Sequence, residues 1–329
     1  MENNKRIYYI IGLVFLLLIS SVVSLAVGTV SISLKEMLAL FTDGITTSGQ
    51  RIVVYVRGPR VIAALFAGAG LAVSGVIIQT ILANPMAGPN IIGVNAGAGF
   101  GEVLCSAVFP GLVLFLPLGA FLGAFVTVLF VYALGRITGS SKITIVLAGI
   151  SINSLINAAT DTIHTFNDDA VLNSSSFRIG GLQGVNINVL IPACIAIFVG
   201  IVITYALHNE MELLSLGDDT AKTLGLSVSK YRLFFLLLAA LLAGSCVSFS
   251  GLLGFVGLIV PHIARIMVGS ECKYLIIVST LLGAVFLMIC DLLARILFSP
   301  FELPVGIILS FIGAPFFIYL LLRRNKNRM

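Results

Sequence analysis

The stretch 61-VIAALFAGAGLAVSGVIIQTIL-82 decides the fold class of this protein. Its 22 residues include no charged side chain, and a helix of that length reaches about 33 Å, enough to cross a hydrocarbon layer about 30 Å thick. The whole chain is similar in character, because it is 59% hydrophobic and only 10% charged, with a mean hydropathy of +1.13. A soluble domain carries about a quarter charged residues. We therefore predict an all-α polytopic membrane protein.

Apolar segments of this kind recur along the chain and leave no room for a soluble domain. The first follows Lys5 and Arg6 and is longer than the apolar core of a signal peptide, so we interpret it as a retained membrane helix. The sequence predicts a single transmembrane domain over 1–329 with about ten spans. These are 7–30, 61–82, 91–109, 112–134, 143–163, 189–207, 231–250, 252–268, 274–298 and 305–322.

The distribution of Lys and Arg predicts the orientation of the chain. Ten spans place both termini on one side, and cytoplasmic loops carry an excess of basic residues. With cytosolic termini, thirteen basic residues fall inside and six outside, and the six are Lys35, Arg51, Arg57, Arg60, Arg178 and Arg295. We therefore expect cytosolic N- and C-termini. The net charge of +5 reflects this bias and gives no reason to expect a nucleic-acid partner.

A weak internal repeat suggests two related halves. A shift of 176 residues aligns 67-AGAGLAVSG-75 with 243-AGSCVSFSG-251 and Pro85 with Pro261. The two segments run in opposite directions under the ten-span topology, which is typical of inverted repeats in transporters, here with halves of about 50–165 and 225–322. We also expect each half to break at its proline, where a helix end must be buried in protein or line a cavity. The alternative is that small residues simply allow close helix packing.

Polar residues in the fifth span form a stripe. Asn153, Asn157, Asp161 and His164 are spaced four, four and three residues apart, so a helix places them on one face. Such residues either line a water-filled pathway or hydrogen-bond between helices. Glu102 is a lone carboxylate in the third span. It is a proton site in a proton-coupled carrier, or it pairs with a neighbouring helix or reaches the interface.

Three arginines are expected at the outer face. Arg57 and Arg60 stand at the outer mouth of the second span, and Arg295 follows Asp291 by one helical turn, which predicts an intrahelical ion pair. The arginines either bind an acidic partner or anchor at lipid headgroups.

The polar stretch 216-LGDDTAKTLGLS-227 interrupts the apolar chain and predicts a short helix presented to a partner. Leu216, Ala221 and Leu224 are expected to share one face of it. An enzymatic role is not favoured, because the three histidines are well separated and the chain lacks H-E-x-x-H and G-x-S-x-G motifs. It also lacks a P-loop, so any ATP-driven activity requires another chain.

Five stretches, in order, resemble the FecCD family, the permease subunits of type II ABC importers for iron-siderophores, haem and cobalamin. The resemblance covers the chain from about residue 50 to its end. The stretches are 57-RGPR-60, 79-QTILANPMAGPNIIGVNAGAG-99, 216-LGDDTAKTLGL-226, 255-FVGLIVPHIAR-265 and 291-DLLARILFSPFELPVGIILSFIGAPFFIYLL-321.

The resemblance implies roles for particular residues. Segment 208–230 would be a cytoplasmic coupling segment that docks on an ATPase subunit, through Leu216, Gly217, Asp218, Ala221, Leu224 and Gly225, with Gly217 and Gly225 as turn and helix stop. Arg57, Arg60 and Arg295 would meet acidic residues of a solute-binding protein. A cytoplasmic gate would involve Asn84, Pro85, Met86, Ser140 and Ser141. Asn153, Asn157 and Asp161 would line the pathway.

The resemblance also implies an assembly in the cell membrane. Two copies of the permease, most simply a homodimer, would work with two ATPase subunits and one extracytoplasmic binding protein by alternating access. ATP and magnesium would bind the ATPase, and this chain itself would hold no cofactor or metal. The sequence departs from the family at 177-FRIGGLQG-184, which lacks a Trp, and at Glu102. The rival hypotheses are a proton-coupled secondary transporter, with Glu102 or Asp161 as the proton site, and an intramembrane enzyme.

Overall fold

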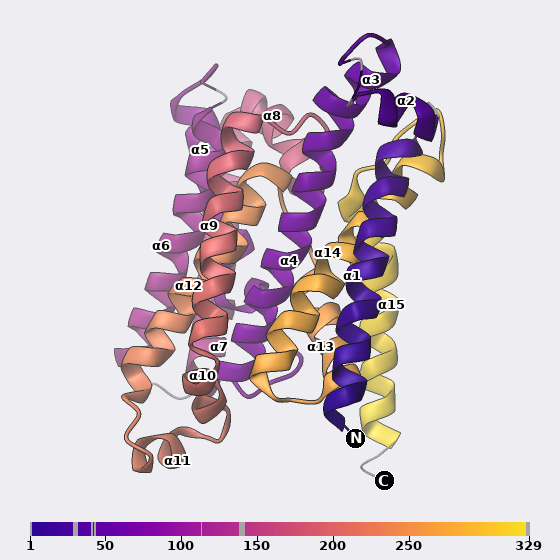
Figure 1. Cartoon of the computed structure of the whole chain (residues 1–329). Coiled ribbons are helices and arrows are strands. Elements are labelled where there is room, and N and C mark those ends of the chain that lie inside the picture. The colour runs from indigo at the N-terminus through magenta and orange to yellow at the C-terminus, as the bar shows by residue number, and fades with distance from the viewer. Residues whose placement is uncertain are drawn as a thin grey trace.

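The computed structural model describes residues 2–28, 32–40, 42, 44–112, 114–137 and 142–326, and every regular element in these ranges is helical (Figure 1). The all-α prediction is confirmed. The α-helices are α1 (Glu2–Ala26), α2 (Leu34–Ala39), α3 (Ser48–Ile52), α4 (Gly58–Ile81), α5 (Val94–Val108), α6 (Phe115–Ile137), α7 (Lys142–Phe166), α8 (Asp168–Ile179), α9 (Ile187–Ala206), α10 (His208–Ser215), α11 (Asp218–Thr223), α12 (Val228–Ser250), α13 (Val256–Val268), α14 (Cys272–Ile296) and α15 (Val305–Lys326). A π-helical turn, η1 (Val53–Arg57), and a 3₁₀ turn, η2 (Pro89–Ile92), complete them.

Seven helical stretches among the described residues are long and apolar enough to cross a membrane. They are Lys5–Ala26, Ser48–Ile81, Phe115–Ile137, Lys142–Phe166, Ile187–Ala206, Val228–Ser250 and Cys272–Ile296. Three shorter apolar stretches, Val94–Val108, Val256–Val268 and Val305–Leu320, fall below the length of about 20 residues that a full crossing requires. Each of the ten predicted segments overlaps one of these stretches.

The second span begins earlier than predicted, because helical turns continue upstream of α4 to Ser48. Thr47 starts α3 with a capping box, in which its side chain accepts from the backbone N–H of Gln50. Pro59 has no N–H to donate, and the Gly58 N–H just before it bonds five residues back to the Val53 carbonyl, which widens this turn to π geometry. The chain therefore passes from α3 into α4 without a break.

Helix α4 forms the centre of the bundle. In its most apolar window 83% of the residues are buried, compared with 17% for α1, which lies at the edge. Small residues let three neighbours approach α4 closely: Gly68 packs on Gly283 of α14, Gly75 packs on Gly257 of α13, and Ser74 Oγ donates to the Ala239 carbonyl of α12 at 2.8 Å. The small-residue stretch 67–75 thus allows close helix packing, as the alternative to the repeat hypothesis expects.

The two segments that the repeat hypothesis aligns lie on α4 and α12, and the inverted repeat of the two halves stays a prediction. Helices α4 and α12 run in opposite directions, and α1 begins at the end of the bundle where α15 ends and where α10 and α11 lie (Figure 1).

Two expected breakpoints differ from the structure. Helix α13 does not begin at residue 252 but at Val256, because Gly251 and Phe255 adopt left-handed φ angles of 67° and 66°. The chain also does not break at Pro261, which lies inside α13. A proline there cannot donate to the Gly257 carbonyl, and Gln79 Nε2 donates to that oxygen instead at 3.2 Å. Tertiary contact thus satisfies the backbone group that the proline leaves open.

Candidate functional site

Helices α10 and α11 form a compact segment between α9 and α12, at the end of the bundle where α1 begins (Figure 1). Gly217 and Gly225 bound α11 with φ angles of 104° and 86°, which glycine adopts without strain. After α11 the N–H of Gly225 donates to the Lys222 carbonyl and that of Leu226 to the Ala221 carbonyl, as in a Schellman motif. The predicted turn and helix stop at these two glycines are therefore present.

Three contacts hold this segment on the bundle. Met211 and Leu214 of α10 are buried. Glu212 Oε2 accepts from the backbone N–H of Cys272 at 2.7 Å and so caps the start of α14. Asp218 forms an ion pair with Arg232 of α12, whose side chain is buried. Direct bonds thus connect α10 and α11 to α14 and α12.

The exposed face of the segment differs from the expected one. Leu216 and Leu224 are 56% and 58% exposed, whereas Ala221 is fully buried against the bundle. The prediction that all three share one face is wrong for Ala221, because the Asp218–Arg232 pair turns α11 so that its alanine points inward. Two exposed leucines, with the solvent-facing pair Asp219 and Lys222 beside them, form the surface that a partner would meet.

Asp218 also makes the segment sensitive to pH. The hydrogen bond from Arg232 lowers the pKa of the Asp218 carboxyl below its usual value, so this carboxylate stabilises the segment above about pH 4 and the contribution is lost as the pH falls through the lowered pKa. We expect Asp218→Asn to weaken the attachment of α11 by about 1–2 kcal/mol at pH 7. Hydrogen exchange of the amides of residues 218–226 measures this loss.

The control for this change is Asp219→Asn, whose carboxylate is exposed and pairs only with Lys222 at 3.6 Å. It should leave the exchange rates almost unchanged. Below the lowered pKa, wild type and Asp218→Asn should converge. Equal protection of wild type and Asp218→Asn at pH 7 would contradict the assigned role of the ion pair.

The predicted gate residues form a tight turn after α4. Ala83 has a φ of 47°, the Asn84 N–H donates to the Gln79 carbonyl at 3.0 Å, and the Met86 N–H donates to Asn84 Oδ1 at 3.0 Å. Pro85 is exposed at the tip of this turn. Ser140 and Ser141 lie outside the described residues.

Sequence reasoning missed a polar link beneath this turn. The Arg265 guanidinium donates to Gln79 Oε1, and Gln79 Nε2 in turn donates to the Gly257 carbonyl at 3.2 Å. Gln79 begins one of the stretches that resemble the FecCD family, and Arg265 ends another. Their places in these two stretches were the only signal in the sequence that could have suggested this contact. The link joins the end of α4 to α13.

A cavity of about 240 Å³ lies beside the turn. Its lining includes Met86, Asn90 and Leu258, with the aromatic side chains of Phe255 and Phe317. Asn153 of α7 reaches this region, because its Nδ2 donates to the Asn90 carbonyl at 2.9 Å. Asn90 thus connects the cavity with the polar stripe on α7.

Farther along α7, two residues of the stripe are exposed and one is half-buried. Asn157 and Asp161 face outward on α7, and His164 Nε2 lies 3.2 Å from Ser174 Oγ of α8. Only 22% of the most apolar window of α7 is buried. The two ends of the stripe thus bond neighbouring elements of this chain, through Asn153 and His164, whereas Asn157 and Asp161 between them are left open to a pathway or to a second chain.

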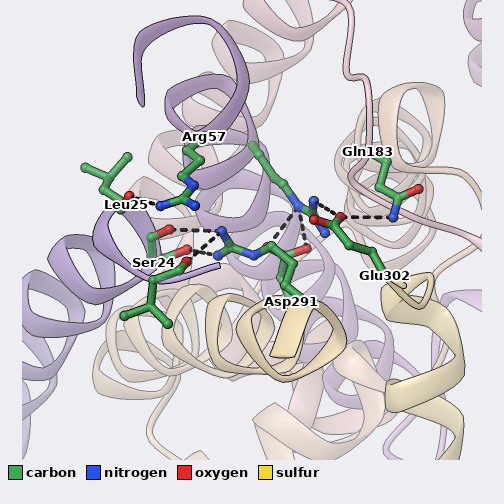
Figure 2. A network of polar contacts seen from close by, with 9 residues as sticks. Ser24, Leu25, Arg57, Gln183, Asp291 and Glu302 are labelled. Carbon is green, nitrogen blue, oxygen red and sulfur yellow. Dashed lines mark hydrogen bonds and ion pairs between the residues drawn. The ribbon is translucent and has the colours of Figure 1, made fainter. Parts of the chain in front are cut away.

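The three arginines expected at the outer face are buried in a polar network (Figure 2). Arg60 Nε donates to both carboxylate oxygens of Asp291, at 2.9 and 3.1 Å, and its Nη1 pairs with Glu302 at 2.6 Å. Arg295 Nε lies 3.2 Å from Asp291 Oδ2, an ion pair without hydrogen-bond geometry, which agrees with the expected intrahelical pair.

The remaining guanidinium groups of this network contact the end of α1. Arg57 Nη1 donates to the carbonyls of Leu25 and Ala26 at 2.8 and 2.9 Å, and Arg295 donates to Ser24. These three arginine side chains are therefore not exposed for docking, contrary to the expectation from the sequence. Carbonyls at a helix end and two carboxylates draw these side chains inward, because a buried guanidinium is stable only when it is paired.

These features describe a polytopic helical membrane protein with a short polar segment, α10–α11, held at one end of its bundle. Comparison with known proteins identifies the family to which it belongs. The profile of the FecCD transport family matches residues 16–323, and the chain belongs to this family of ABC transporter permeases.

Two relatives and one solved structure are similar over almost the whole chain. The Fe(3+)-citrate import system permease protein YfmE of Bacillus subtilis is 34% identical over 97% of this chain and 96% of its own length. IsdF of Staphylococcus aureus, named as a heme-iron transport system permease, is 33% identical over the full length of both chains. A structure described as an inward-facing conformation of an ABC transporter of the metal-chelate type superposes with a TM-score of 0.84 at 30% identity, covering 95% of this chain and 98% of that one.

Proposed function

We propose that this chain is the membrane permease of an ATP-driven importer for chelates of the iron-siderophore, haem or cobalamin type, located in the cytoplasmic membrane. The names of YfmE and IsdF and the metal-chelate class of the superposed structure support the substrate class. The excess of basic residues on one side supports cytosolic termini.

The single observation that carries the proposal is the geometry of α10 and α11. The segment is fixed to the bundle by buried residues, a helix cap and an ion pair, yet it exposes Leu216 and Leu224. Exposed leucines on a rigidly held segment are suited to a protein partner, because little conformational entropy is lost on binding. We assign that partner as the ATPase subunit, which would bind ATP and magnesium.

The proposed assembly contains two permease copies, two ATPase subunits and one extracytoplasmic solute-binding protein. The exposed polar face of α7 supports a pathway shared between two copies, lined by Asn153, Asn157 and Asp161. For the binding protein, we place the contact on the outer loops. The buried arginines Arg57, Arg60 and Arg295 would hold these loops in position and so contribute indirectly to docking.

Alternating access would then proceed through the links described above. ATP-driven closure of the ATPase pair would move α10 and α11, and Glu212 and Asp218 would carry this movement to α14 and α12. The turn at Asn84, Pro85 and Met86, joined to α13 through Gln79, would open or close the cytoplasmic end of the pathway.

Copurification tests the proposal. The tagged chain is extracted gently from its native membranes and the bound ATPase subunit is quantified. We expect about one ATPase per permease for the wild type, and at least tenfold less for the double change Leu216→Asp and Leu224→Asp, because two charges would be buried at the interface. Ala221 is left intact, since it is buried and its replacement would disturb the fold.

Leu172→Asp is the matched control, because Leu172 is 72% exposed on α8, away from the α10–α11 segment (Figure 1). It should retain the ATPase. Absence of any ATPase with the wild type, or full retention by the double variant, would overturn the proposal. Uptake that persists without an ATPase and collapses with the proton gradient would favour the secondary transporter.

A further inference from the structure

A second, polar cavity lies between α5, α8 and the end of α12. It has a volume of about 390 Å³, and its lining includes Glu102, Gln183, Ser248, Ser250, Phe177 and Phe249. Neither the proposed pathway nor the docking segment uses this cavity. Its lining combines a carboxylate, neutral oxygens and aromatic side chains.

Glu102 is the unusual member of this lining. The residue is 1% exposed, and its Oε2 is buried with no hydrogen-bond partner among the described residues. A buried carboxylate without a partner is strongly unfavourable unless it meets a cation or takes up a proton. The fold therefore places one carboxylate in the cavity, and no side chain of the described residues donates a hydrogen bond to its Oε2.

The neutral groups around Glu102 present oxygen lone pairs to the cavity. Ser248 Oγ donates its hydrogen to the Ser245 carbonyl, and Ser250 Oγ donates to the Cys246 carbonyl, both at 2.8 Å. Gln183 directs Nε2 to Glu302 at 3.1 Å. Because each hydroxyl has a single hydrogen, these serines can only accept from a ligand. Two acceptor oxygens beside a carboxylate favour a positively charged donor.

We propose that this cavity binds an alkylammonium cation. A single carboxylate matches a single positive charge, and the described residues contain no group of three or more His, Cys, Asp and Glu side chains that could hold a metal ion. The volume is far larger than the roughly 30 Å³ that one water occupies, so an organic ammonium fits better than a bare ion. Phe177 and Phe249 also line the cavity, and aromatic rings attract ammonium groups.

Direct binding of n-butylammonium chloride to the full chain tests this proposal. The chain is reconstituted in nanodiscs of phosphatidylglycerol alone, and calorimetric titration measures the dissociation constant against sodium chloride at equal ionic strength. We expect saturable, one-site binding to the wild type. Glu102→Gln keeps the shape and removes the charge, so affinity should fall at least tenfold. Because binding is measured without transport, failure here leaves the proposed import function untouched.

Asp169→Asn is the matched control. It removes an exposed acidic charge from α8, and Asp169 is not among the cavity residues, so the affinity should not change. If Glu102→Gln does not fold, Ser248→Ala with Ser250→Ala replaces it and should weaken binding about threefold. Absence of saturable binding to the wild type, or equal binding by these variants, would overturn the proposal. Sodium binding as tight as n-butylammonium would overturn the assignment to an organic ammonium.

The ammonium group has two sources, a soluble amine or the headgroup of a lipid. Nanodiscs that contain phosphatidylethanolamine distinguish them. A weaker apparent affinity for n-butylammonium in those nanodiscs assigns the cavity to the lipid headgroup. An unchanged affinity assigns it to soluble amines, including those on a transported chelate.

Discussion

Replacing Asp291 with asparagine should lower the free energy of unfolding by about 3–5 kcal/mol, because removal of one partner from a buried ion pair leaves the other charge uncompensated. Asp291 is 1% exposed and stands between Arg60 and Arg295, which are 6% and 2% exposed. An asparagine offers one acceptor oxygen where the two guanidinium groups now share a carboxylate. Glu302 would remain as the only acid paired with Arg60 (Figure 2).

Unfolding of the purified chain in detergent, followed by circular dichroism, measures this loss. Asp219→Asn makes the same chemical change at a fully exposed carboxylate and should alter stability by less than about 0.5 kcal/mol. If Asp291→Asn were no less stable than Asp219→Asn, the network would not stabilise the C-terminal end of α14. The same variant should loosen α1, because Arg295 also binds Ser24.

Replacing Gly75 with valine should destabilise the chain by about 3 kcal/mol, at the upper end of the range for overpacking a well-packed core. A Cβ at position 75 would overlap the carbonyl oxygen of Gly257. That obstacle is backbone and cannot rotate away, so α4 and α13 would have to separate. Separation would also break the bond between Gln79 and Gly257 one turn further along α4.

Gly12→Val is the control for this change, since a Cβ at Gly12 on the exposed face of α1 has no neighbour within 4 Å. Valine has a slightly higher helix propensity than glycine, so this variant should be as stable as the wild type or more stable by less than about 1 kcal/mol. Thermal unfolding in detergent compares the two variants. Equal stability would show that α4 and α13 do not need their close approach.

The fold class and the order of the spans were predictable from the sequence. Long apolar segments without charges have few stable arrangements in a bilayer, because backbone groups must be satisfied within each helix. The turns at Gly217 and Gly225 were predictable for the same kind of local reason, since glycine adopts left-handed φ angles at little cost. Breakpoints were less predictable. Pro261 remains inside α13 because Gln79, 182 positions earlier in the chain, bonds the carbonyl that the proline leaves open.

The candidate site was also predictable from the sequence only in part. The polar stretch 216–227 predicted a short helical segment outside the apolar spans, but not which of its residues are exposed. Ala221 is buried because Arg232 binds Asp218 and sets the rotation of α11. The arginines at the outer mouth look exposed in the sequence, where Asp291 and Glu302 are more than 230 positions away from Arg60.

The sequence by itself determined that this chain is a helical membrane permease and where its polar segments lie, because hydrophobicity, proline and glycine act locally along the chain. Only the tertiary structure decided which charges are buried together and which leucines stay exposed. It alone also showed that Glu102 lines a cavity and that its Oε2 has no hydrogen-bond partner among the described residues. Burial and pairing depend on residues that are far apart in sequence, and the energy of a charge is set by what surrounds it in space.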